Sequence, residues 1–298
     1  MKATKTTKPA PTTKRIVGVV VLAGMAAVLA YALSGPNDQS TGPSGLAGFV
    51  STASAAEGTT GVQSAGPSSG ASAAAMQQAA SANKYLFAFL YEKDDDATRA
   101  ARKAFDAAVK KITPAPQSVA LDRTAPAEKE FVAKFGVDRA PMPLVLAIAP
   151  NGAVTGGFKA AELTEERLRD AVASAGLQKC VKALQDKRLV LVCLQNGRTK
   201  ANDAAMKGVN EFKADPQFGA MTDIVKVDPS DTKEMKLLAQ LKADPQAKMA
   251  TTAFLAPPGV LVANIDGPTS KDALKAALQK AMSSCAPGAG SGCCPPKK

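Results

Sequence analysis

The stretch "VALDRTAPAEKEFVAKFGVDRAPMPLVLAIAPNGAV", residues 119–154, is the strongest indication of the fold. It opens inside an apolar run typical of a strand, "QSVALD" at 117–122, and continues into a segment with helical character at 126–135. The run "MPLVLAIAPNGAVTGGF" at 142–158 then places two apolar segments on either side of Asn151-Gly152. An Asn-Gly pair between apolar runs is a strong signal of a β-hairpin. The stretch therefore predicts a strand, a helix and a hairpin, in that order.

The flanking sequence extends this pattern in both directions. Upstream, "YLFAFLY" at 85–91 is typical of a buried strand, and apolar residues at helical spacing follow it over 97–111. Downstream, a helix is predicted at 163–175. The predicted order is β-α-β-α-β-β-α, which indicates an α/β fold.

The same order recurs about 105 residues later. Asp122 in "VALDRTAP" matches Asp228 in "VKVDPSD", and the turn "APNG" at 149–152 matches "APPG" at 256–259. A repeat of this length indicates two copies of one small domain rather than a solenoid. The predicted elements of the second copy are a strand at 187–195, a helix at 200–214, a strand at 221–228, a helix at 232–243, a hairpin at 251–267 and a helix at 271–282.

Both copies resemble the thioredoxin fold, over about residues 84–175 and 178–284. Pro143, nine residues before Gly152, falls at the position of the cis-proline of that superfamily. The resemblance implies two tandem domains, 84–176 and 177–284, each with a central mixed sheet flanked by helices. In the second copy the cis-proline position falls near Ala250-Thr251, which holds no proline.

The catalytic pair of a thioredoxin does not carry over. Such proteins place C-x-x-C after the first strand, at a helix N-terminus that lowers the thiol pKa. The matching positions hold no cysteine, so they lack the thiolate that dithiol exchange requires. They read Asp94-Asp95-Asp96-Ala97 in the first copy and Gly197-Arg198-Thr199-Lys200 in the second.

The three aspartates at this position have three interpretations. Carboxylates at a helix N-terminus accept hydrogen bonds from free amides and meet the positive end of the helix dipole, so capping explains them without a ligand. The alternatives are a cation site formed by Asp94, Asp95 and Asp96, or an acidic patch that binds a partner. Adjacent carboxylates lack the alternate spacing of a calcium loop.

Composition excludes several classes of function. The chain has no His and no Trp, which removes Ser-His and Cys-His catalytic pairs and most stacking platforms for single-stranded nucleic acid. The net charge is +11, but residues 1–15 carry five positive charges and no negative one. The remaining charges are of mixed sign and form no run of positive charge. We therefore expect no nucleic-acid partner.

The N-terminal region predicts attachment to a membrane. Residues 16–34, "IVGVVVLAGMAAVLAYALS", carry no charge, and about 19 residues just span a bilayer core. The basic residues 1–15 before them predict a cytoplasmic N-terminus and extracytoplasmic or periplasmic domains. Ala30-Tyr31-Ala32 supports a rival interpretation, a cleaved signal peptide and a secreted product. Residues 35–83 are rich in Gly, Ser, Ala and Thr and predict a disordered linker, in which a marginal helix near 71–82 is possible.

Five cysteines remain. Cys193 lies in an apolar strand, which indicates a buried thiol. Cys180 lies on the preceding helix and could form a disulfide with Cys193. Cys285, Cys293 and Cys294 lie in a Gly/Pro/Ala-rich tail, 285–298. They predict a disulfide within the tail or between two chains, a soft-metal site for Cu(I) or Zn, or a redox-active vicinal pair, unless they have no specific role. No other cofactor is expected.

These observations favour a membrane-tethered protein whose two thioredoxin-like domains bind a protein partner, as binding modules or scaffold, for example in envelope protein maturation. The alternative is a thiol–disulfide oxidoreductase or soft-metal carrier whose chemistry lies on the tail cysteines. The sequence leaves the question of enzyme activity open and does not identify the partner.

Overall fold

The computed structural model describes residues 70–284. The expected basic tail (1–15), membrane segment (16–34) and cysteine tail (285–298) lie outside the described residues, as do positions 35–69 of the expected linker. Within residues 70–284, no helix is both long enough and apolar enough to cross a membrane.

The first sheet has the strand order β2-β1-β3-β4. The β1 strand pairs in parallel with β2 and antiparallel with β3, and β3 pairs antiparallel with β4. Gly152, with φ of 80°, supplies the left-handed residue that the turn between β3 and β4 needs. The strands are β1 (Leu86–Tyr91), β2 (Gln117–Asp122), β3 (Leu144–Ile148) and β4 (Val154–Lys159).

The second sheet repeats this topology with the order β6-β5-β7-β8. The β5 strand is again parallel to its first neighbour, β6, and antiparallel to β7, which forms a hairpin with β8. The strands are β5 (Leu189–Leu194), β6 (Thr222–Val227), β7 (Thr251–Ala256) and β8 (Val260–Asp266). The expected α/β fold with two mixed sheets is confirmed.

Helices flank both sheets. Those of the first repeat, residues 70–174, are α2 (Ala71–Ser81), α3 (Asp96–Val109), α4 (Lys129–Phe135) and α5 (Glu165–Ala171). Those of the second repeat, residues 175–284, are α6 (Ala175–Gln185), α7 (Asn202–Lys213), α8 (Met235–Leu241) and α9 (Lys271–Ser284). Successive side chains of a strand point to opposite faces, so Phe87 and Phe89 pack in the cluster of α3 and α5, and Leu86 and Leu90 in that of α2 and α4.

The expectation that all of residues 35–83 form a disordered linker is wrong for residues 71–81. They form α2, which lies against β1 and β2 and buries Ala79. The amide of Ser72 in its first turn donates to the carboxylate of Glu128 at 3.4 Å. An alanine-rich helix of this length is marginal alone, and the apolar sheet face stabilises it.

The helix expected at 163–175 forms, but it is shorter than expected. The α5 helix ends at Ala171, and α6 begins at Ala175, two residues before the expected domain boundary. The Ser174 hydroxyl caps α6 by accepting from the amide of Leu177 at 3.3 Å. Glu234 accepts from the amide of Gly176 at 2.8 Å, as Glu128 does for α2 in the first repeat.

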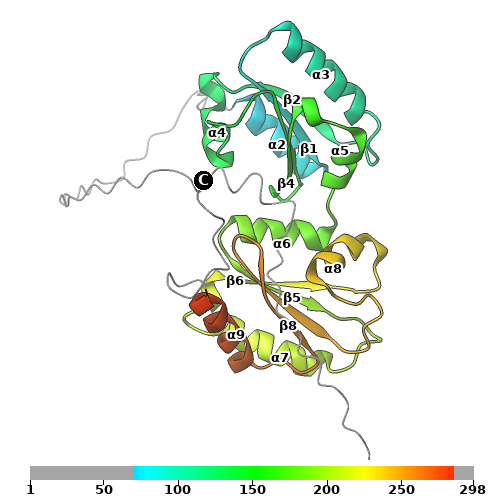
Figure 1. Ribbon diagram of the computed structural model, residues 1–298, viewed down its shortest axis with the longest axis vertical. Helices are drawn as coiled ribbons and strands as arrows, with labels where there is room; N and C mark the ends of the chain where they lie inside the picture. The colour runs from blue at the N-terminus through cyan, green and yellow to red at the C-terminus, as the bar shows by residue number, and fades with distance from the viewer. Residues whose placement is uncertain (1–69, 285–298) are drawn as a thin grey trace, which may run out of the picture.

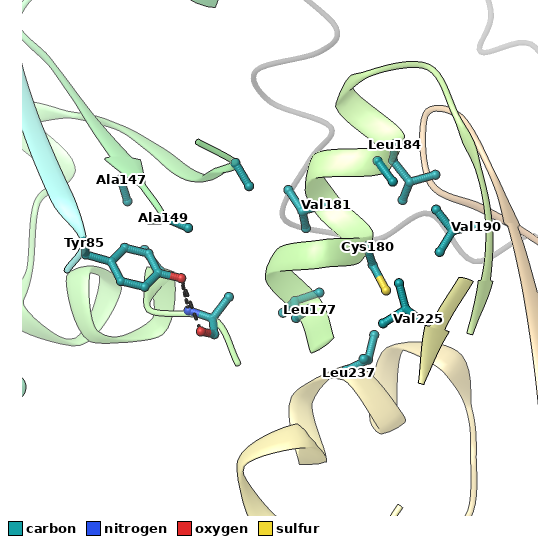
Figure 2. Close-up of a cluster of buried hydrophobic side chains, with 14 of the residues drawn as sticks. Tyr85, Ala147, Ala149, Leu177, Cys180, Val181, Leu184, Val190, Val225 and Leu237 are labelled. Atoms are coloured by element: carbon teal, nitrogen blue, oxygen red, sulfur yellow. Dashed lines mark hydrogen bonds between the residues drawn. The ribbon is translucent and has the colours of Figure 1, made fainter. Parts of the chain in front are cut away.

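One hydrophobic core joins the two repeats. The α6 helix packs on the second sheet and also contacts β4 of the first (Figure 1). Figure 2 shows Leu177, Cys180 and Val181 of this helix between Tyr85 of the first repeat and Val225 of the second, all in one buried cluster. The Gln185 side chain adds a polar link, because its amide donates to the Val154 carbonyl at 2.8 Å and accepts from the Val154 amide at 3.0 Å. The packing on both sides of α6 ties the repeats together.

Candidate functional site

The first candidate position lies in the loop between β1 and α3. Asp95 is the N-cap of α3, and its carboxylate accepts from the amide of Thr98 at 2.8 Å. This hydrogen bond lowers the pKa of Asp95 below its ordinary value. The capping interpretation of the aspartates is therefore confirmed for Asp95.

The two neighbouring aspartates pair with an arginine on the same helix. Arg99 lies 2.7 Å from the Asp96 carboxylate and 3.6 Å from that of Asp94, and both pairs are exposed to solvent. Within residues 70–284, no three His, Cys, Asp or Glu side chains come together as metal ligands. The geometry of the three aspartates is that of a helix start, with part of the negative charge offset by Arg99.

Arg123, which the sequence analysis did not single out, holds the loop that precedes Pro143. Arg123 follows β2 and donates from Nη1 to the carbonyls of Val137 at 3.2 Å, Asp138 at 2.9 Å and Ala140 at 2.9 Å. Its other terminal nitrogen pairs with Glu92, at the end of β1. One guanidinium thus fixes the chain segment that precedes Pro143.

The Met142–Pro143 peptide bond is cis, at the position where the sequence interpretation places the cis-proline. The second repeat has no proline at the matching Ala250-Thr251, and its cis bond lies instead between Pro257 and Pro258, in the β7–β8 turn.

The second candidate position, Gly197 to Lys200, is closed by the chain's own backbone. The amide of Lys200 donates to the Lys248 carbonyl, and the amide of Ala250 donates to the Lys200 carbonyl, both at 2.9 Å. Lys200 and Met249 thereby form a parallel bridge directly before β7. The amide and carbonyl of Lys200 are therefore already hydrogen-bonded within the chain, at the position where the resemblance to the thioredoxin fold places the active site.

Side chains also hold this loop in place. The Asn196 amide donates to Asp228 at 2.8 Å, and Thr199 donates to Asn202 at 2.7 Å. The hydrogen bond from Asn196 is the main reason that the pKa of Asp228 lies below its ordinary value. Asp228 is one of the two residues that the repeat aligned, whereas nothing in the sequence pattern pointed to Asn196.

The two cysteines of the described chain are free, so the disulfide that the sequence left open between Cys180 and Cys193 does not form. Cys180 lies in the core shared by the repeats, while Cys193 lies in the cluster under α7 and α9 on the opposite face of the second sheet. Cys193 is 3% exposed, which confirms its expected burial. Burial raises the pKa of Cys180 to about 12 and that of Cys193 to about 11. Neither thiol is therefore available as a thiolate near neutral pH.

The tail cysteines Cys285, Cys293 and Cys294 lie outside the described residues. Whether they bind metal, form disulfides or remain free stays a prediction from the sequence.

No protein-family model matches the sequence, and the comparison with curated proteins finds no match. Among solved structures, the chain is similar to a mutant of the alkylhydroperoxide reductase AhpF of Enterococcus faecalis (13% identity, TM-score 0.24, 69% of this chain and 98% of that one). It is also similar to the first two thioredoxin domains of Eps1p from Saccharomyces cerevisiae (10% identity, TM-score 0.26, 73% and 99%). A third similar structure is that of ERdj5, with 11% identity, a TM-score of 0.25 and coverage of 68% and 26%. Likenesses at this level carry no argument about function.

Proposed function

We propose that the chain is a non-catalytic, thioredoxin-like binding or scaffold protein. The observation that carries this proposal is the state of the two former active-site positions. Asp95 is used as a helix cap in the first, and in the second the backbone of Lys200 is paired with the segment before β7. Neither position holds a thiol, and residues at both positions form hydrogen bonds that stabilise the local backbone.

The buried thiols support the same proposal. A reductase needs an accessible thiolate and a second thiol that resolves the mixed disulfide. Cys180 and Cys193 are both buried, have raised pKa values and face opposite sides of one sheet. The two repeats thus supply a rigid double platform without dithiol chemistry of their own.

The proposal includes tethering. The uncharged run at 16–34, preceded by basic residues, anchors the platform on the extracytoplasmic side of a membrane, and 285–298 supplies thiols that can link two copies. The partner is then an envelope or secreted protein during its maturation.

A second candidate function rests on the tail sequence alone. Three cysteines within ten residues, two of them adjacent, are typical of soft-metal binding or of a labile disulfide. In this alternative the repeats only carry a thiol–disulfide oxidoreductase or a carrier of Cu(I) or Zn.

Precipitation of insulin under limiting dithiothreitol tests protein binding and the oxidoreductase form of the alternative in one assay. A reductase shortens the lag before the B chain precipitates, whereas a protein that binds the B chain lowers the final turbidity. We expect the full chain to lower the turbidity without shortening the lag, and a variant with Ser at 285, 293 and 294 to behave identically. A shortened lag that this variant loses would establish the alternative, and unchanged turbidity and lag would remove the support for binding.

A further inference from the structure

An apolar cavity opens beside the first helix of the described chain. Its volume is about 220 Å³, and it lies between the C-terminal half of α2, the start of β1 and the β3–β4 turn. Met76, Ala79 and Ala80 line it from α2, and Leu86 and Ile148 line it from the sheet. Ala80 is exposed, so the cavity is accessible from solvent.

The second repeat explains why the space is open. The α6 helix corresponds to α2, and Leu184 on it corresponds to Ala80. Leu184 is buried in the shared core, where α6 is covered on both sides. The shorter Ala80 leaves unfilled volume, and an apolar cavity of roughly 150 Å³ is already large enough to hold a benzene ring.

The chain carries one segment suited to this cavity. Residues 35–69 are small and polar apart from Leu46, Phe49, Val50 and Val62. Phe49 is their one aromatic residue, it is adjacent to Val50, and no charge lies between Asp38 and Glu57. Burying this segment therefore requires no buried charge.

The length of the intervening chain permits docking within one molecule. Phe49 is 21 residues before Gly70, where the described chain begins. A flexible coil of that length spans roughly 25 Å. The cavity lies at the far end of α2, a helix of about 16 Å at 1.5 Å per residue. Because the length of this tether matches the distance to be spanned, the effective concentration of Phe49 at the cavity is in the millimolar range.

We propose that the segment 46–50 docks on the first repeat and places the ring of Phe49 in the cavity beside α2. Docking folds the N-terminal tether back along α2 and shortens the distance between the membrane-proximal segment and the platform.

Tryptophan fluorescence of the full chain tests this, because the sequence has no Trp. A Phe49→Trp variant is expected to emit at a shorter wavelength than Val62→Trp and to be several-fold less quenched by acrylamide. Adding Ala80→Leu, which copies Leu184 into the cavity, should return both signals to those of an exposed indole. The matched control Ala74→Leu changes an exposed residue of the same helix that does not line the cavity, and it should leave the signals unchanged.

Three results would overturn the proposal. Equal emission from the two Trp variants would show that position 49 is exposed. A short-wavelength signal that Ala80→Leu does not change would place the ring elsewhere, including in detergent around the membrane segment. A signal that grows with protein concentration would show docking onto a second copy instead of within one chain.

Discussion

The hydroxyl of Tyr85, at the start of the first sheet, is bonded to both backbone polar groups of Ala173, at the junction of the repeats. It accepts from the Ala173 amide at 2.7 Å and donates to the Ala173 carbonyl at 3.3 Å (Figure 2). The two residues are 88 positions apart. The Ala173 carbonyl also accepts from the side-chain amide of Gln178 at 2.8 Å, so the buried Ala173 amide is the group that depends on the Tyr85 hydroxyl.

Replacing Tyr85 by Phe should therefore weaken the junction. The substitution leaves the buried Ala173 amide without its acceptor, which costs roughly 1–3 kcal/mol of unfolding free energy. Urea denaturation followed by circular dichroism measures the change. Tyr91→Phe is the matched control, because Tyr91 ends the adjoining strand β1 and is only partly buried, and it should be nearly neutral. Equal effects of the two substitutions would contradict the role given to the Tyr85 hydroxyl.

Removing α2 should destabilise the first repeat. A chain of residues 84–298 lacks the helix that covers Leu86 and Ala88, whereas a chain of 70–298 keeps it. We expect the shorter chain to lose roughly 2–4 kcal/mol of unfolding free energy, comparable with deleting a large core side chain. Thermal melts of the two chains measure this. Coincident melts would mean that α2 contributes no stability.

Close contact between α7 and the start of α9 should make Gly208 intolerant of a side chain. A Cβ atom at this position would lie 1.9 Å from the Thr269 carbonyl oxygen. Alanine is favoured over glycine in a helix by about 1 kcal/mol. Overpacking typically costs about 1–3 kcal/mol or more, so we expect Gly208→Ala to lower the melting temperature.

Gly197→Ala provides the control for this substitution. A Cβ atom at Gly197 would meet nothing within 4 Å, so the change should be nearly neutral. A melting temperature of Gly208→Ala at or above that of the parent chain would show that α9 moves away at little cost.

Burial of Cys180 predicts a loss of stability at alkaline pH. Its pKa is raised from 9.0 to about 12, mainly by burial and further by the charge of Glu234. Above pH 9 the thiol ionises in the unfolded chain while it stays neutral in the folded one. The stabilisation that is fully present below pH 9 is therefore lost progressively as pH rises towards 12. Cys180→Ala should be less stable than the parent at pH 7 because it leaves a cavity, and the gap should narrow above pH 9.

Urea midpoints at several pH values between 7 and 12 measure this gap. Cys193→Ala should show a similar narrowing that ends earlier, since the pKa of Cys193 is raised only to about 11. A gap that stays constant with pH for both variants would mean that neither thiol is held neutral by the fold.

The order of strands and helices follows from the sequence alone, since alternation and turn chemistry act over a few residues. Asn151-Gly152 located the first hairpin, and the match of Asp122 with Asp228 revealed the repeat, with both residues in equivalent turns after parallel strands. The position of Asp95 before a helical run was enough to predict its capping role.

Features that depend on contacts between distant segments emerge only in the folded chain. The α2 helix has little amphipathic pattern of its own and forms because a sheet face lies beside it. The burial of Cys180 and Cys193 on opposite faces follows from the side of the sheet on which α6 packs, which periodicity does not specify. Arg123 gains its role because the carbonyls of Val137 to Ala140 arrive from 14 to 17 residues away. Local pattern fixes the strands and most of the helices, while long-range packing stabilises α2 and determines which segments meet and therefore which side chains are buried, paired or left open.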